Sequence, residues 1–340
     1  MTCSPEAQAV TRGLGFDCDD VSPIVSVRLS WAHWTMPVLE LLVVGGAIFA
    51  LVHAVRRYRA GDRVNLALWW ASLVYLFVIE PPLYFPEWFG LDHIYGFIFA
   101  HNRFTVQFMW DRLPLYIVAF YPMISQLAYE VVRSLGVFRR GALPGAVAVA
   151  FVCQVFYEVF DHIGPQLRWW AWNPADHVVN QPAMASVPLQ SALLFASVSF
   201  AAMTYLVVRL VRSGRSFVLW TAVAGVLTPL AMALAGIPSR LAGGNVTAQA
   251  WVLGVELGLV WLAGVWVVVT TREVVQPSAF ARYYPAVYLG VMAVFWISAL
   301  PAYFGAVGGI TADGTPIGSG LYALACFCAA GATLYRTRRA

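Results

Sequence analysis

The segment 157–174 (YEVFDHIGPQLRWWAWNP) follows a run of almost entirely apolar residues and holds side chains that can exchange protons. Four polar residues in and just before this segment are spaced at i, i+4, i+7 and i+8, a spacing that predicts one face of a helix. They are Gln154, Glu158, Asp161 and His162. Ionisable side chains inside a membrane span are costly and therefore indicate function. We expect Glu158 and Asp161 to be catalytic, and the other two to contact the substrate.

A third acidic residue, Glu80, lies in the sequence VIEPP at the end of another apolar segment. We expect it at the same depth and on the same side of the membrane, and it is the third candidate catalytic carboxyl. The segment 113–133 adds Tyr116 as a candidate substrate contact. Glu40 and Glu256 are also predicted to lie inside the membrane.

These residue types indicate acid catalysis on an apolar substrate. A carboxylic acid enclosed by apolar groups keeps its proton more easily than one in water, because desolvation disfavours the anion. Such a group can protonate a carbon–carbon double bond as a general acid. Aromatic faces stabilise the resulting cation, so we expect Trp169, Trp170 and Trp172 to line the substrate site. The alternative is an aromatic belt at the membrane interface.

Two arginines in the polar loops, Arg112 and Arg168, are further candidate substrate contacts. The alternative is structural. In that interpretation Glu158 and Asp161 are interfacial residues whose carboxylates bind these arginines or backbone amides.

The composition decides which elements must hold these residues. Of 340 residues, 60% are hydrophobic and 11% charged, with a mean hydropathy of +0.71, whereas soluble domains are about a quarter charged. Windows of roughly 20 apolar residues recur. We therefore expect an all-α, polytopic bundle of transmembrane helices, and we exclude the water-soluble enzyme classes. The net charge of +4 comes from arginines in short loops and does not indicate a nucleic-acid partner.

Eight to nine spans are expected in one integral membrane domain, residues 1–340. The nine candidates are 37–55, 65–85, 113–133, 142–162, 187–210, 217–236, 248–270, 284–304 and 319–335. All 21 basic residues are arginine, and 15 follow the odd-numbered spans, against 6 on the other side. The positive-inside rule then places the N-terminus outside and the C-terminus in the cytoplasm. The composition, rich in Ala, Val, Gly and Arg, suggests a bacterial plasma membrane.

Three segments lie outside the cytoplasm in this topology: a polar N-terminal segment (1–35) and two long aromatic loops (86–112 and 161–186). We expect the two loops to pack together over the mouth of the bundle. A pocket for a long apolar ligand is expected beneath them, lined by Glu80, Tyr116, Glu158, Asp161 and tryptophans.

Cysteines and histidines give little sign of a metal or cofactor. None of the six histidines forms an HxxH, HxxxH or HExxH motif, so no metal and no cofactor are expected. Cys3 and Cys18 flank the N-terminal segment, where a disulfide and free thiols both remain open.

Across about residues 80–200 the chain resembles the membrane-integral carotenoid biosynthesis proteins, which include bacterioruberin-type carotenoid hydratases. The resemblance rests on two stretches. The first is Arg112-Leu113-Pro114-Leu115-Tyr116 after the HNRFTVQFMWD segment. The second is an acidic pair, a Trp-x-Trp and a Val-Pro-Leu, here Glu158, Asp161, Trp170-Ala171-Trp172 and Val187-Pro188-Leu189. It implies a membrane enzyme that acts on an isoprenoid.

We therefore expect an isoprenoid- or carotenoid-modifying enzyme of hydratase or cyclase type, a lyase or isomerase. Glu158 is the first choice as proton donor, with Asp161 holding water and Glu80 as the third candidate. Its partners would be the lipid bilayer and an apolar, isoprenoid or lipid-like substrate. The alternative is a transporter, or a non-catalytic subunit of a cell-envelope complex, whose intramembrane carboxylates act as relay or structural sites.

Overall fold

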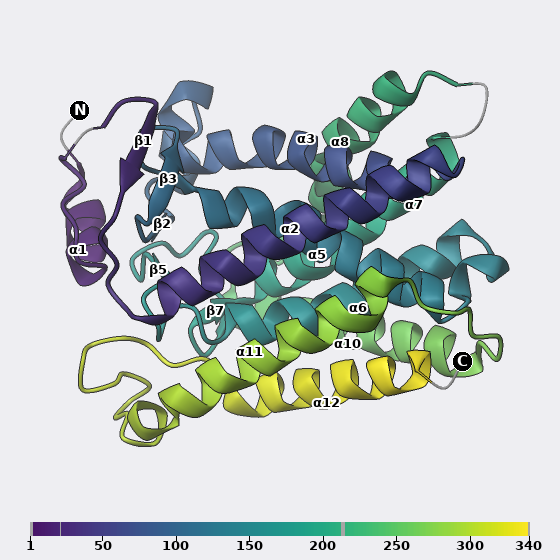
Figure 1. Ribbon diagram of the computed structural model, residues 1–340. Helices are drawn as coiled ribbons and strands as arrows, with labels where there is room; N and C mark the ends of the chain where they lie inside the picture. Colours follow the sequence, from purple (N-terminus) through teal and green to yellow (C-terminus); the bar gives the residue numbers. More distant parts are fainter. Residues whose placement is uncertain (1–2, 21, 212–214, 339–340) are drawn as a thin grey trace.

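The structure, a computed structural model, describes residues 3–20, 22–211 and 215–338. It is an all-α bundle of long, roughly parallel helices, as predicted (Figure 1). The bundle helices are α2 (Thr35–Arg59), α3 (Val64–Tyr84), α5 (Leu115–Ser134), α6 (Ala142–Asp161), η3 (Ser191–Ser199) with α7 (Phe200–Leu210), α8 (Phe217–Ala235), α9 (Ile237–Leu241), α10 (Val246–Thr270), α11 (Ala279–Phe304) and α12 (Gly320–Thr337).

Eight helical segments of the described chain are long and apolar enough to cross a membrane. The ninth predicted span is α12, which has 18 residues and lies beside α6 and α11. The prediction of eight to nine spans is therefore confirmed. The prediction for α11 began too late, at 284, because Ser278 caps the helix by accepting a hydrogen bond from the Ala281 N–H.

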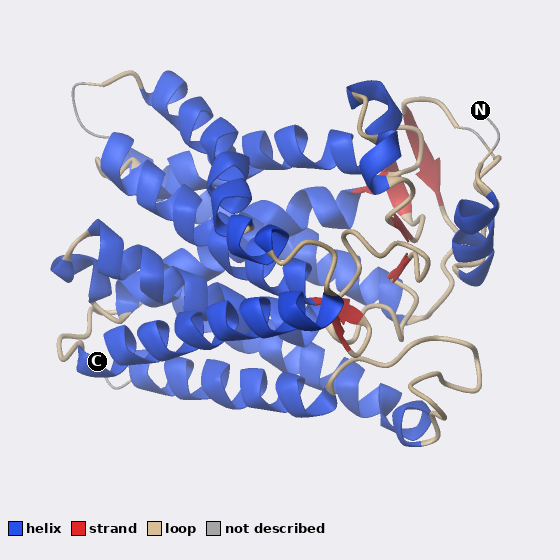
Figure 2. Cartoon of the chain, turned by 180° about the vertical axis from the view of Figure 1, so that it is seen from behind, coloured by secondary structure: helices blue, strands red, loops and turns tan. Residues whose placement is uncertain are grey.

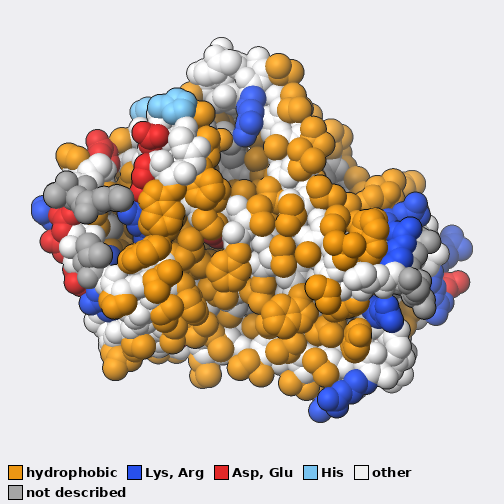
Figure 3. Space-filling model, turned by 90° about the horizontal axis from the view of Figure 1, so that it is seen from above, with side chains coloured by type: hydrophobic (Ala, Val, Ile, Leu, Met, Phe, Trp, Pro, Cys, Tyr) orange, Lys and Arg blue, Asp and Glu red, His pale blue; other side chains and the backbone are white. Residues whose placement is uncertain are grey.

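The two central helices are α5 and α6. Within their apolar windows 89% and 78% of the residues are buried, against 28% in α8, α10 and α11. The latter three therefore present most of their apolar side chains outward. In Figure 3 an apolar band covers the middle of one face, and charged side chains lie toward its two ends. This pattern is typical of a multi-pass membrane protein.

The arginine-rich loops meet at one end of the bundle. Arg63 donates to the carbonyl of Arg215, Arg140 to that of Val267, and Arg336 to that of Thr271. The loops that follow the odd-numbered spans, which the sequence predicted to lie on one side of the membrane, thus lie at the same end of the bundle. Arg212 and Arg339, which belong to the same arginine count, lie outside the described residues.

The strands gather at the opposite end, where they form a cap (Figure 2). The cap contains α1 (Pro5–Gly13), η1 (Pro86–Phe89), α4 (Asp92–Tyr95), β1 (Val25–Arg28), β2 (Phe99–His101), β3 (Thr105–Phe108), β4 (Leu113–Pro114), β5 (Trp170–Trp172), β6 (Ala183–Met184) and β7 (Val187–Pro188). Its three sheets have the orders β1-β3-β4, β2-β5 and β6-β7. A disulfide joins Cys3 to Cys18 beside α1. A short 3₁₀ helix, η2 (Val137–Arg140), links α5 to α6 at the arginine-rich end.

The two aromatic loops pack together, as predicted. β2 pairs antiparallel with β5, placing Phe99 opposite Trp172 and His101 opposite Trp170. The Asn102 N–H donates to the Trp169 carbonyl at 2.8 Å, and the Asn173 N–H donates to the Ile98 carbonyl at 2.8 Å. Residues far apart in sequence are thereby held in one register over the ends of α5 and α6.

Candidate functional site

A cavity of about 100 Å³ lies beneath the paired loops, between α3, α5, α6 and η3. Its lining is mostly apolar and aromatic. The residues are Glu80, Leu83, Ile98, Phe99, His101, Ile117, Phe120, Tyr121, Tyr157, Phe160, Asp161, Trp170, Trp172, Val179, Pro188, Gln190, Ser191, Leu194 and Phe195. The half-exposed Leu83, Leu194 and Phe195 form its rim, so the cavity reaches the surface between α3 and η3.

Aromatic rings form a large part of the wall. Phe160 stacks on Phe120 with 4.4 Å between ring centroids and lies 4.9 Å from Trp170. Trp170 fits against Gly164, where an added Cβ would lie 2.0 Å from the Trp170 Cη2. The glycine therefore lets the tryptophan close the wall from the loop side. Of the three predicted tryptophans, Trp170 and Trp172 line the cavity.

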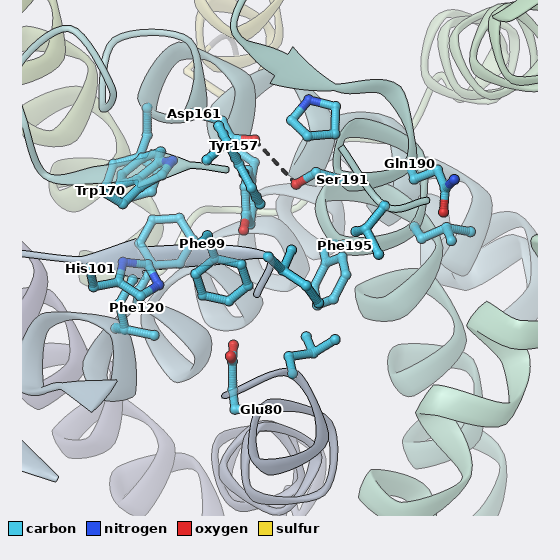
Figure 4. A pocket seen from close by; sticks show the side chains of 18 of the residues that line it. Glu80, Phe99, His101, Phe120, Tyr157, Asp161, Trp170, Gln190, Ser191 and Phe195 are labelled. Atoms are coloured by element: carbon cyan, nitrogen blue, oxygen red, sulfur yellow. Dashed lines mark hydrogen bonds between the residues drawn. The ribbon is translucent and has the colours of Figure 1, made fainter. Parts of the chain in front are cut away.

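Two carboxyl groups face this cavity from opposite sides. Figure 4 shows Asp161, from the end of α6, and Glu80, from α3, with Phe99 and Tyr157 between them. The Asp161 Oδ2 lies 3.4 Å from the Ser191 Oγ, and the Tyr121 hydroxyl donates to the Glu80 Oε1. Both residues are almost fully buried, with 3% and 5% of their surfaces exposed. Asp161 and Glu80 therefore line one cavity, as predicted.

Local helix geometry brings Ser191 to Asp161. The segment η3 is π-helical, and such turns recur at functional sites because they displace side chains from the α-helical positions. The Val187-Pro188-Leu189 entry pairs in the β6–β7 hairpin directly before it. Together they place Pro188, Gln190 and Ser191 against the cavity.

Glu158 lies elsewhere, which corrects the expectation that it lines this pocket. It is fully buried on the side of α6 that packs against α12, and its Oε2 lies 3.2 Å from the His162 Nε2. Gln154 donates to the Tyr322 hydroxyl at 3.3 Å, and His162 Nδ1 accepts from the Ser319 N–H at 3.1 Å. Three of the four residues predicted to share a face do so, whereas Asp161 turns toward η3.

Two other residues that were predicted to contact the substrate, Tyr116 and Trp169, instead bond to other parts of the protein. Tyr116 is buried behind the wall and donates to the Trp169 carbonyl at 2.8 Å, so the expectation that it lines the pocket is wrong. The Trp169 Nε1 donates to the Thr35 Oγ1 at 2.8 Å, which ties the loop to α2.

The two arginines also lie away from the cavity. Arg112 donates to the Tyr84 carbonyl and stacks its guanidinium 4.3 Å from the Phe85 ring centroid. Arg168 donates to the Asp313 carbonyl at 3.0 Å. Neither arginine forms an ion pair with Glu158 or Asp161 in the described residues, so the interpretation of these acids as arginine-paired interfacial residues is wrong.

The sequence prediction did not include His101, which lines the cavity from β2. Burial lowers the pKa of its ring to about 3, so the imidazole is neutral at physiological pH. The sequence feature that could have identified His101 is its position in the polar, aromatic HNRF stretch. It was missed because the histidines were considered only as members of paired metal-binding motifs.

Potential metal ligands converge at one place in the described residues, Cys3, Cys18 and Asp19, where the two sulfurs already form the disulfide. The chemistry available in the cavity is therefore that of two carboxyls, a neutral imidazole, two phenols and aromatic faces. Comparison of the chain with protein-family models, with curated proteins and with solved structures found no match in any of the three.

Proposed function

We propose that the protein is a membrane-embedded enzyme that protonates a double bond of an isoprenoid, of carotenoid hydratase or cyclase type. The observation that carries the proposal is one cavity that combines two buried carboxyls, Asp161 and Glu80, with a lining of aromatic and aliphatic side chains. An acid is needed to form the cation, and aromatic faces stabilise it without reacting with it.

Asp161 is assigned as the proton donor. Its hydrogen-bond partner, Ser191, is distant at 3.4 Å and leaves the carboxyl free to turn its proton into the cavity. The alkene π electrons form the new C–H bond, and the tertiary cation lies against Phe99, Phe120 and Tyr157. Glu80, held by Tyr121, faces the cation from the opposite side of the cavity, where its carboxyl oxygens stabilise the positive charge.

The cation is quenched in one of two ways, and neither changes the oxidation state of the substrate overall. Water adds through its oxygen and releases a proton to a carboxylate, which yields a tertiary alcohol. Alternatively, the cation, either directly or after attack by a second double bond, loses a proton from a neighbouring carbon to that carboxylate, which yields a new double bond. These outcomes correspond to a lyase and an isomerase.

The cavity size limits how the substrate binds. Sites for drug-sized ligands enclose about 300–1,000 Å³, so about 100 Å³ holds the end of an isoprenoid chain and a water rather than a whole carotenoid. The prediction of a pocket deep enough for a whole long ligand is therefore wrong. The apolar rim between α3 and η3 lets the remainder of the chain lie in the bilayer.

In this proposal the protein is a multi-pass component of a bacterial plasma membrane, with the cap outside. The substrate class is proposed from the resemblance of the motifs in residues 80–200 to those of the membrane-integral carotenoid biosynthesis proteins. Glu80, Asp161, Trp170 and the Val187-Pro188-Leu189 entry all lie within that stretch and contribute to the cavity or its frame.

A transporter, or a non-catalytic subunit of an envelope complex, is the second candidate. Glu158 supports it, because both carboxyl oxygens are buried without a hydrogen bond in the described residues while His162 lies 3.2 Å away. Such a pair resembles a proton-relay site. Proton uptake into liposomes that contain the purified protein tests this function separately.

The enzyme proposal is tested by profiling the isoprenoids and pigments of a deletion strain and of a strain complemented with the wild-type or Asp161→Asn chain. We expect an accumulated precursor in the deletion strain that wild type, but not the variant, removes. Purified protein incubated with an acyclic carotenoid or squalene in D₂O should place deuterium at a former alkene carbon. Identical profiles in all strains and no deuterium uptake would refute the proposal.

A further inference from the structure

The hydrogen bonds around His101 determine which of its ring nitrogens carries the proton. The His101 Nδ1 lies 3.1 Å from the Tyr116 hydroxyl oxygen, and that hydroxyl donates to the Trp169 carbonyl at 2.8 Å. A hydroxyl has one hydrogen, and a carbonyl oxygen can only accept. The hydrogen in the His101–Tyr116 contact therefore belongs to Nδ1.

A neutral imidazole carries a single N–H, so this arrangement leaves a lone pair on Nε2. The neutral state is enforced by burial, which lowers the pKa of His101 to about 3. The pairing of the loops stabilises the tautomer further. The Trp169 carbonyl accepts from the Asn102 N–H as well as from Tyr116, and both bonds measure 2.8 Å.

The Nε2 lone pair has no protein donor in the part of the chain that the structure describes. Four aromatic rings surround the imidazole with centroids 5.2–6.1 Å away: Tyr84, Phe99, Tyr116 and Trp170. His101 lines the cavity that also holds Asp161 and Glu80 (Figure 4). A fixed hydrogen-bond acceptor in an apolar wall favours a ligand that brings a donor.

We infer that His101 binds the hydroxyl of a tertiary isoprenoid alcohol, or the water that becomes this hydroxyl, so that the reaction is hydration or its reverse rather than cyclisation. The inference rests on the proposed function and specifies its reaction class. His101 is then a catalytic residue, because its Nε2 contacts the reacting oxygen.

The step balances without an external oxidant or reductant. The Asp161 proton passes to the alkene carbon, and the water oxygen forms the C–O bond to the cation while its released proton passes to the His101 Nε2. This proton then returns to the Asp161 carboxylate. The sum is alkene plus water to alcohol, and in the reverse direction the alcohol loses water.

The first test observes the tautomer and the ligand directly. Protein with ¹⁵N-labelled histidine, reconstituted in nanodiscs, is titrated with linalool, a tertiary isoprenoid alcohol, and with myrcene, the triene that linalool yields on losing water. We expect an unprotonated Nε2 signal, assigned by its loss in His101→Phe, that shifts with linalool and not with myrcene. A protonated Nε2, or equal shifts with both ligands, overturns the inference.

The second test compares affinities. Loss of one hydrogen bond of about 0.5–1.5 kcal/mol changes affinity by roughly 2–10-fold. His101→Phe should lower the preference for linalool over myrcene by that factor, whereas His93→Phe, at an exposed position in α4, should not change it. Tyr116→Phe removes the partner of Nδ1 and should let both tautomers appear. An unchanged preference in His101→Phe contradicts the inference.

Turnover in D₂O separates the failure of this inference from failure of the proposed function. If the protein prefers the alcohol but takes up no deuterium, the His101 binding site is supported and the proposed enzyme activity is refuted. If deuterium is taken up but only cyclised or isomerised hydrocarbon forms, the assignment of Asp161 as the proton donor is supported and hydration is refuted.

Discussion

Glu158 and Asp161, three residues apart on α6, contact different neighbours. The Glu158 carboxyl lies 3.2 Å from His162 Nε2 on the side facing α12, whereas Asp161 lies 3.4 Å from Ser191 and lines the cavity. In an α-helix, two side chains that are three residues apart point in directions that differ by about 60° around the helix axis. That rotation is sufficient to separate the two acids, and it moves the proposed proton donor from Glu158 to Asp161.

Asp161→Asn should abolish deuterium incorporation while the protein remains folded. The amide keeps the volume and can still bond Ser191, but it has no transferable proton. Loss of a general acid typically lowers the rate about 10²–10⁴-fold. The measurement is deuterium uptake per purified, monodisperse protein, with Ser191→Ala as the control for the hydrogen bond alone. Full uptake in Asp161→Asn would remove this residue from the mechanism.

Glu158→Gln should reduce turnover far less than Asp161→Asn, because Glu158 is not part of the cavity wall. Glutamine can accept a hydrogen bond from the His162 Nε2, which requires that nitrogen to carry the hydrogen. The Ser319 N–H bond to Nδ1 already imposes that tautomer. A variant that is folded but as inactive as Asp161→Asn would show that Glu158 supplies the proton after all.

Gly164→Ala should impair the cavity from the loop side. The added Cβ would lie 2.0 Å from Trp170 Cη2, so the tryptophan or the loop must move. Such overpacking typically destabilises a protein by about 1–3 kcal/mol. The matched control is Gly258→Ala on α10, where an added Cβ meets nothing within 4 Å. Thermal stability and linalool affinity should both fall in Gly164→Ala, whereas Gly258→Ala, in a helix interior where alanine is favoured over glycine, should lower neither.

The cap should lose stability in acid through Asp111. Burial acts to raise its pKa, but hydrogen bonds from Ser26, Ser22 and Arg28 and the charge of Arg103 outweigh it, so the pKa is lowered. The Arg28 NH2 lies 2.7 Å from the Asp111 Oδ2. Because the folded pKa is below that of the unfolded chain, this stabilisation is complete above the ordinary value of about 3.9 and is lost as the pH falls through the folded pKa.

The check is thermal unfolding from pH 7 to pH 2 for the wild type and Asp111→Asn. The wild type should lose more stability than the variant below about pH 4, and at pH 7 the variant should already be less stable. Removing hydrogen bonds to a charged group costs about 1.5–3 kcal/mol each in general. Parallel pH profiles for the two proteins would show that the Asp111 contacts do not stabilise the cap.

The proposed orientation is tested by labelling in intact cells, in a chain whose free cysteines Cys153, Cys326 and Cys328 are replaced by alanine. Ala175→Cys, exposed in the second aromatic loop, should react with an impermeant maleimide from outside. Ala60→Cys, exposed after α2, should react only after permeabilisation. The reverse pattern would invert the bundle and place the cavity on the cytoplasmic side.

The sequence by itself determined the helical architecture, because windows of roughly 20 apolar residues leave a helix as the structure that satisfies every backbone group in lipid. The arginine pattern also identified which loops share an end. The aromatic, polar composition of residues 86–112 and 161–186 was enough to predict that these loops meet.

The tertiary structure alone decided which polar residues share the site. Helical spacing grouped Glu158 with Asp161, but which neighbour each one contacts depends on where η3 and α12 pack around α6. His101 enters the cavity through the pairing of β2 with β5, and this pairing joins residues some 70 positions apart in sequence. Periodicity within one segment carries no information about such a partner, because the strand register is fixed by contacts between the segments.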